Sequence, residues 1–151
     1  MSCIADSFLL FKIYNHYSSF SERESTPKYY FTDNSLLNLF LTDKRSALLE
    51  NAVAIRLKQH YGDEVCYVKS AVTGLDIDFY IPSEHMAVQV CMQLNDQSSG
   101  REIENLIKAS ACMPDLKRLV VITNDETALN HPARSRIEII PIDVFMLKGF
   151  V

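Results

Sequence analysis

The sequence of 151 residues is 48% hydrophobic and 23% charged, and its 15 basic and 19 acidic side chains give a formal net charge of −4. This composition suits a single globular domain with one large core, and it excludes disordered and collagen-like chains. A negative chain has no general attraction for polyanions, so nucleic-acid binding would need a local basic patch, and the sequence shows no obvious one.

Glycine and cysteine positions exclude several kinds of site. The four glycines lie at least twelve residues apart, so the chain lacks the GxGxxG and GxxxxGK[ST] phosphate-binding loops, which need clustered glycines. Its four cysteines show no CxxC pairing, no signal-peptide pattern precedes them, and no apolar run approaches the roughly 20 residues of a membrane span. We therefore expect a reduced, cytoplasmic chain with no membrane partner.

Two aromatic-rich runs near the N-terminus, Phe8–Tyr14 and Lys28–Thr32, predict a β-hairpin with a long mobile tip. A lone hairpin is marginally stable in water, so we expect it to pack on the rest of the chain or on a second copy. Exposed apolar edges favour association, and a homodimer formed through this hairpin is therefore one of the two expected arrangements.

Two helices are expected next. The capping cluster Asp33–Ser35 precedes a short helical run at Leu36–Leu41. Apolar residues then recur at helical spacing from Ser46 to Tyr61, and Gly62 supplies the usual C-terminal stop.

The remaining pattern alternates between strands and helices, with Leu116–Thr123 apolar on both faces like a central strand. This order predicts an α/β sheet flanked by helices and preceded by the N-terminal hairpin. The elements expected are strands at Glu64–Val68, Asp76–Ile81 and Met86–Met92, a helix from Arg101 to about Ala111, strands at Leu116–Thr123 and Ile137–Ile140, and a short closing turn at Ile142–Leu147.

Three acidic residues occupy positions where core-facing residues are expected. Asp76 and Asp78 share one face of a strand, and Glu50 lies beside the apolar stripe of its helix. An unpaired buried carboxylate costs on the order of several kcal/mol, so such residues usually meet a partner or hold a metal. If the following strand pairs with the first, Gln89 and Cys91 would join Glu50 and Asp78 in one constellation.

This constellation resembles the restriction-endonuclease-like, PD-(D/E)XK pattern, which has a helical Glu, a strand Asp and a (D/E)xK motif on the next strand. More closely, the chain resembles the nuclease-like C-terminal domain of unknown function carried by prokaryotic AAA-type ATPases. The similar segments are KYYFxD at Lys28–Asp33, LLEN at Leu48–Asn51 and xDF at Ile77–Phe79. The resemblance covers nearly the whole chain. It implies a restriction-endonuclease-like mixed sheet in residues 35–151 and a winged-helix wing remnant in residues 1–34.

The third motif departs from the active pattern, because the chain has Gln89-Val90-Cys91 where an acid and a lysine are expected. A neutral amide and a soft thiol are poor ligands for Mg²⁺, and a cysteine cannot replace the lysine. The resemblance therefore implies a vestigial site of Glu50, Asp78, Gln89 and Cys91, with no catalytic residue and no cofactor.

The function expected from this resemblance is non-catalytic. The chain would be a degenerate nuclease-like domain of an AAA-type ATPase, a fragment or a separately encoded part, acting as an interaction or DNA-contacting module. The resemblance implies the ATPase part as the partner. DNA is a possible second partner, but the negative net charge does not support DNA binding. Two alternatives stay open: a weak Mg- or Mn-dependent DNA phosphodiesterase with Glu50, Asp76 and Asp78 as metal ligands, and a structural oligomerisation domain.

Structural roles are equally open for the same residues. Asp78 can accept hydrogen bonds at a buried strand end, and Glu50 can pair with Lys44. A nucleophilic Cys91 is disfavoured, because no histidine is spaced to activate it, and a small buried hydrophobe is the better interpretation. Packing explains the N-terminal tyrosines, and a solvated edge explains basic pairs such as Lys117-Arg118, better than nucleic-acid contact does.

Overall fold

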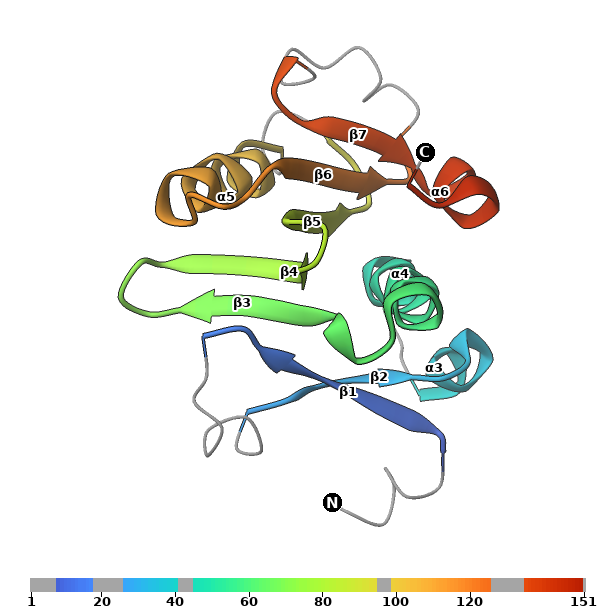
Figure 1. Cartoon of the computed structure of the whole chain (residues 1–151). Coiled ribbons are helices and arrows are strands. Elements are labelled where there is room, and N and C mark those ends of the chain that lie inside the picture. The colour runs from blue at the N-terminus through green and yellow to red at the C-terminus, as the bar shows by residue number, and fades with distance from the viewer. Residues whose placement is uncertain (1–7, 18–25, 41–44, 95–98, 126–134, 151) are drawn as a thin grey trace.

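The computed structural model describes residues 8–17, 26–40, 45–94, 99–125 and 135–150, which build one mixed β-sheet with helices on both faces (Figure 1). The sheet has seven strands in the order β2-β1-β3-β4-β5-β6-β7. The predicted α/β class is therefore confirmed. Most of the expected mobile hairpin tip falls in residues 18–25, outside the described residues.

The N-terminal hairpin forms one edge of this sheet. Strands β1 (Leu10–Asn15) and β2 (Lys28–Phe31) pair antiparallel, as predicted, and β1 also pairs in parallel with β3 (Cys66–Ser70). Ile13 and Tyr30 are buried in the core that the hairpin shares with the following strands and helices. The hairpin thus packs on its own chain, and association with a second copy stays a prediction.

The first two helices begin and end close to their sequence signals. Helix α3 (Asn34–Phe40) starts at the predicted capping cluster, where Asp33 Oδ1 accepts a hydrogen bond from the backbone N–H of Ser35 at 2.7 Å. Helix α4 (Arg45–Tyr61) stops at Gly62, whose φ of +59° is one that glycine adopts without penalty.

The remaining elements follow the predicted order, with their ends shifted by a few residues. Strands β3, β4 and β5 pair antiparallel, whereas β5, β6 and β7 pair in parallel, so α5 serves as the crossover between β5 and β6. These elements are the 3₁₀ turn Gly62–Glu64, β4 Leu75–Ile81, β5 Met86–Cys91, α5 Ser99–Cys112, β6 Arg118–Thr123, β7 Glu138–Pro141 and α6 Ile142–Lys148.

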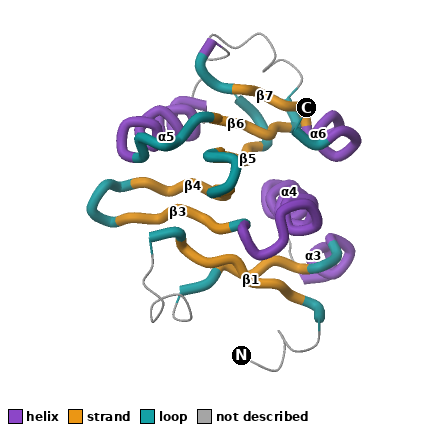
Figure 2. The backbone as a smooth tube through the Cα atoms, in the orientation of Figure 1, coloured by secondary structure: helices purple, strands orange, loops and turns teal. Residues whose placement is uncertain are grey.

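Helices α4 and α6 cover one face of the sheet and α5 covers the other (Figures 1 and 2). The core between the sheet and helices α4 and α6 contains Leu57 and Phe145, and the core on the other face contains Leu106 of α5. Val120 and Val121 are both fully buried, one in each core, which confirms the prediction that β6 is a central strand. No helix within the described ranges is long and apolar enough to span a bilayer.

Candidate functional site

A β-bulge in β4 places Asp78 where the sheet changes its pairing. The register between β3 and β4 shifts next to Asp78, so β4 carries an extra residue there. The extra residue reverses the alternation of side chains along the strand. Ile77 packs in the core under α5, whereas Phe79 packs in the core under α4.

Strands β4 and β5 stop pairing through their backbones at the same point. Their ladder runs as far as Phe79 and Val88, and beyond it the side chain of Gln89 takes over. Gln89 Oε1 accepts a hydrogen bond from the Asp78 backbone N–H at 3.1 Å, and Asp78 Oδ2 accepts one from the Val90 N–H at 3.0 Å. These reciprocal bonds join the strands across a cleft of about 390 Å³ that also touches β2, α4 and α5. We call it the polar cleft.

The charged side chains of the polar cleft neutralise one another. Every cation among them lies within ion-pair distance of an acid, including Lys69 at 3.2 Å from Asp76 and Arg101 at 2.8 Å from Glu102. The cleft therefore offers little unpaired positive charge to a polyanion. The charged lining residues are Lys28, Lys69, Arg101, Glu50, Asp76, Asp78 and Glu102.

Lys28 links the two acids that the sequence singled out. Its Nζ lies 3.8 Å from Asp78 Oδ1 and 4.0 Å from Glu50 Oε1, and 5.2 Å from the centre of the Tyr67 ring. Glu50 Oε1 also accepts a hydrogen bond from the Tyr30 hydroxyl at 2.7 Å. Burial and the Glu50 carboxylate raise the pKa of Tyr30 well above its usual value, so its phenol stays a donor. An ammonium group thus lies against both carboxylates.

Asp78 titrates near neutral pH. Burial raises its pKa to about 7, and the nearby Glu50 and, more weakly, Glu102 act in the same direction. The ammonium of Lys28 and the hydrogen bond from the Val90 N–H lower the pKa, but they do not offset the loss of water. A substantial fraction of Asp78 is therefore protonated at pH 7.

Gln89 is used entirely within the structure. The side chain is buried, and its Nε2 donates to the backbone carbonyl of Asp76 at 3.3 Å and to Glu102 Oε2 at 2.5 Å. A carboxylate in this position would have no hydrogen to donate and would face the carboxylate of Glu102. The amide at the third motif position therefore holds α5 to the edge of β4.

Cys91 does not lie in the constellation in which the sequence placed it. Its side chain is buried in the apolar core under α5 and does not line the polar cleft. Burial raises the pKa of the thiol to about 11, so it stays protonated. Gln89 lies on β5 like Cys91, but it reaches β4 because its side chain is longer and the backbone pairing of β4 with β5 has already ended.

Glu50, Asp76 and Asp78 do not form a trio of metal ligands. The Asp76 side chain is 51% exposed and pairs with Lys69. Among the residues that the structure describes, no group of three His, Cys, Asp or Glu side chains is arranged to hold a metal ion. This arrangement does not fit the metal site of the phosphodiesterase alternative. Lys44, the other expected partner of Glu50, lies outside the described residues.

The sequence analysis did not place Lys28 or Glu102 in the cleft, and it did not predict that Tyr30 binds Glu50 beside it. Lys28 and Tyr30 are two residues apart on β2 and both reach Glu50, a placement that strand alternation in KYYF could have suggested. Glu102 carries no comparable signal, because nothing local ties the start of α5 to Gln89.

Comparison with known proteins identifies no family for the chain. No family model matches the sequence, and no curated protein and no solved structure is detectably similar to it. The three segments that carry the resemblance nevertheless meet at the polar cleft, which Lys28 enters from KYYF, Glu50 from LLEN and Asp78 from IDF.

Proposed function

We propose that this chain is a degenerate nuclease-like domain that does not cleave nucleic acid and serves as an interaction module of an AAA-type ATPase system. One observation carries the proposal. The ammonium of Lys28 lies against Glu50 and Asp78, the pair that would hold a divalent metal in an active site of this kind. A fixed cation from the chain itself takes the place of the metal.

The state of the two acids supports this proposal. Mg²⁺ requires several anionic oxygens in nearly octahedral geometry. Glu50 is already engaged by Tyr30 and Lys28, and a pKa of about 7 leaves Asp78 only partly ionised at neutral pH. A metal ion would have to displace Lys28 and deprotonate Asp78 before either acid could bind it.

The third motif supports the same conclusion. Gln89 is held by hydrogen bonds to both β4 and Glu102, and its neutral amide brings no negative charge to a metal. Cys91 points into the core and supplies no cation. The role in an ATPase system rests on the resemblance of the KYYF, LLEN and IDF segments, which contact one another around the cleft.

Supercoiled plasmid incubated with the protein and Mg²⁺ or Mn²⁺ tests this proposal. We expect no nicking by the natural chain, by Asp78→Asn or by Asp143→Asn, a control that removes an exposed acid from α6. Nicking by the natural chain that is lost in Asp78→Asn and kept in Asp143→Asn would overturn the proposal in favour of a metal-dependent phosphodiesterase.

A further inference from the structure

A second pocket lies between the C-terminal ends of α4 and α6, and its chemistry differs from that of the polar cleft. It has a volume of about 100 Å³ and is lined by the basic side chains of Arg56 and Lys148, the imidazole of His60, and the rings of Tyr61 and Phe150. None of the described residues that line it is acidic. We call it the basic pocket.

The two cations of the basic pocket are available to a ligand. Within the described ranges, neither Arg56 nor Lys148 forms an ion pair, whereas every cation of the polar cleft does. Arg56 and His60 lie four residues apart on α4 and therefore face the same side. Basic residues in a last helical turn also stabilise the helix dipole, but Arg56 lies one turn earlier, so this effect does not account for it.

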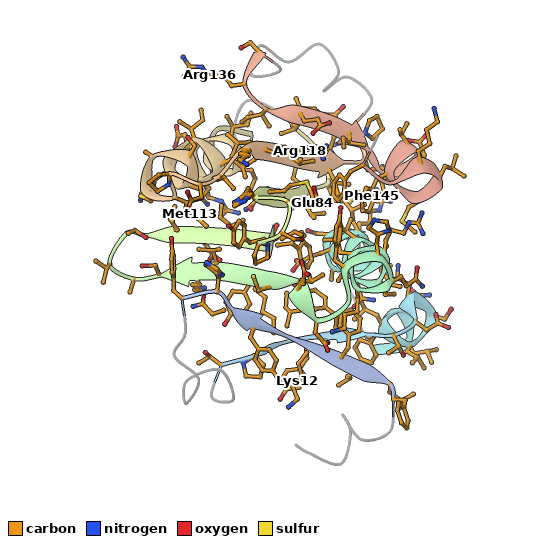
Figure 3. All side chains as sticks on the ribbon, in the orientation of Figure 1. Lys12, Glu84, Met113, Arg118, Arg136 and Phe145 are labelled. Carbon is orange, nitrogen blue, oxygen red and sulfur yellow. The ribbon has the colours of Figure 1, made fainter. Side chains whose placement is uncertain are left out.

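The aromatic rings are fixed beside these cations. The rings of Tyr61 and Phe150 have centroids 6.4 Å apart, and Phe150 packs at 5.0 Å on Phe145, which is buried and labelled in Figure 3. The guanidinium carbon of Arg118 lies 5.7 Å from the centre of the Phe150 ring. Burial and the nearby Glu84 raise the pKa of Tyr61, so its phenol stays neutral. Both half-buried rings present a surface on which a flat group can stack.

The size of the basic pocket limits the kind of ligand. Pockets that enclose a whole small molecule usually measure about 300–1,000 Å³, and this one measures about 100 Å³. It has room for a phosphate group but not for a complete nucleotide. A base attached to that phosphate must lie at the mouth, and the rest of the ligand must continue over the surface.

We propose that the basic pocket binds one nucleotide unit of a single-stranded nucleic acid. Arg56, His60 and Lys148 contact the phosphate, and the base stacks on Tyr61 or Phe150. Such sites combine backbone charge contacts with aromatic stacking and need no sequence preference. The proposal concerns a surface apart from the polar cleft, and it holds whether or not that cleft cleaves.

Fluorescence anisotropy of a labelled oligothymidylate at low salt tests the phosphate contacts. We expect Arg56→Gln/Lys148→Gln to weaken binding about tenfold or more. The slope of log K against log salt should become shallower by about 1.4, for two lost contacts. The matched control is Arg45→Gln/Lys117→Gln, which removes the same charge from two exposed residues and should bind like the natural chain.

Three results would overturn the phosphate contacts: no binding by the natural chain, equal weakening by both double variants, or an unchanged salt slope. Urea unfolding shows whether each variant is folded. If the double variant unfolds, Lys148→Gln replaces it, because Lys148 is exposed and has no partner among the described residues.

Two further ligands test the base and the strand. An abasic strand of the same length should bind about fivefold or more weakly, because it lacks the stacking base. Equal affinity for the abasic strand would overturn the ring contact. If thymidine monophosphate competes as well as the oligonucleotide at equal nucleotide concentration, the ligand is a free nucleotide and the proposal of a single-stranded nucleic acid is overturned. Plasmid nicking has no bearing on these outcomes, so this inference and the proposed function fail separately.

Discussion

The two ends of α4 differ in whether their polar side chains are paired within the chain. Towards its N-terminal end, Glu50 and Asn51 bind residues of β2, among them Lys28. Near its C-terminal end, Arg56 and His60 line a pocket whose described lining includes no acidic residue. The lesson is that pairing within the chain, and not the number of charges, decides which surface can bind a charged partner. A net charge of −4 therefore hides a local basic site.

The largest effect on stability is expected from Gln89→Glu in the polar cleft, which lies beside the N-terminal part of α4. The new carboxylate would face Glu102 and lose both donated hydrogen bonds, which should lower the free energy of unfolding at pH 7 by about 4 kcal/mol. The pKa of the new carboxyl is raised on folding, so the loss should be smallest below about pH 4, where the protonated carboxyl can donate one hydrogen bond, and should grow as the pH rises. Urea denaturation at several pH values measures this.

The control for that prediction is Gln59→Glu, an exposed position on α4 that should change stability by less than about 0.5 kcal/mol. A Gln89→Glu chain as stable as the natural one at pH 7 would contradict the account. For the same reason, the double variant Gln89→Glu/Cys91→Lys, which would introduce the acid and the lysine that the third motif lacks, is not expected to restore a nuclease. It would bury a carboxylate against Glu102 and a lysine in the core under α5.

The next effect concerns the pH dependence of stability through Asp78. Its folded pKa of about 7 lies above the unfolded value near 3.8, so between them the folded state holds a proton that the unfolded state has lost. Stability from this group is complete below about pH 4 and falls as the pH rises towards 7, by about 4 kcal/mol. In Asp78→Asn this part of the fall should disappear. Equal pH profiles for variant and natural chain in urea titrations would show that Asp78 is not perturbed.

A smaller loss is expected from Asn51→Ala, which detaches the hairpin edge from α4. Asn51 accepts a hydrogen bond from the Phe31 N–H at 2.8 Å and donates to the Phe31 carbonyl at 3.1 Å and to Asn34 Oδ1 at 2.8 Å. Removing it deletes these three hydrogen bonds and should cost about 2 kcal/mol. Hydrogen exchange at the Phe31 amide should accelerate. An unchanged exchange rate, with Gln59→Ala as the reference, would contradict this role.

The smallest effect on stability is expected near the C-terminal end of α4, where Arg56 lines the basic pocket. Arg56→Gln removes a side chain with no ion-pair partner among the described residues, so the free energy of unfolding should change by less than about 0.5 kcal/mol. Thermal or urea unfolding measures it. A loss as large as that of Asn51→Ala would show that Arg56 has a structural partner, and it would remove the contrast between the two ends of α4.

Local patterns were sufficient to predict the elements of the fold. The helical spacing in α4 and the double-sided apolar run of β6 each report on burial within one segment, and Gly62 marks the end of α4. The proximity of Glu50 to Asp78 could also be predicted from the sequence, because both residues interrupt otherwise apolar patterns.

The rest of the site depends on contacts between segments distant in the sequence. The bulge at Asp78 arises from the register with β3, and Lys28 reaches Asp78 only because β2 pairs with β1 and packs on α4. The basic pocket joins Arg56 to Lys148 through the packing of α4 against α6. No local pattern contains such pairings, so neither the contact of Lys28 with Asp78 nor the basic pocket could be recognised from the sequence.

Isothermal titration with Mn²⁺ tests most directly whether Lys28 takes the place of a metal ion. We compare the natural chain with Lys28→Met and with Lys117→Met, which removes an exposed lysine from outside the cleft. The account predicts that the natural chain and Lys117→Met do not bind Mn²⁺, and that Lys28→Met gains a weak site at Glu50 and Asp78. Binding by the natural chain that is lost in Lys28→Met would contradict it.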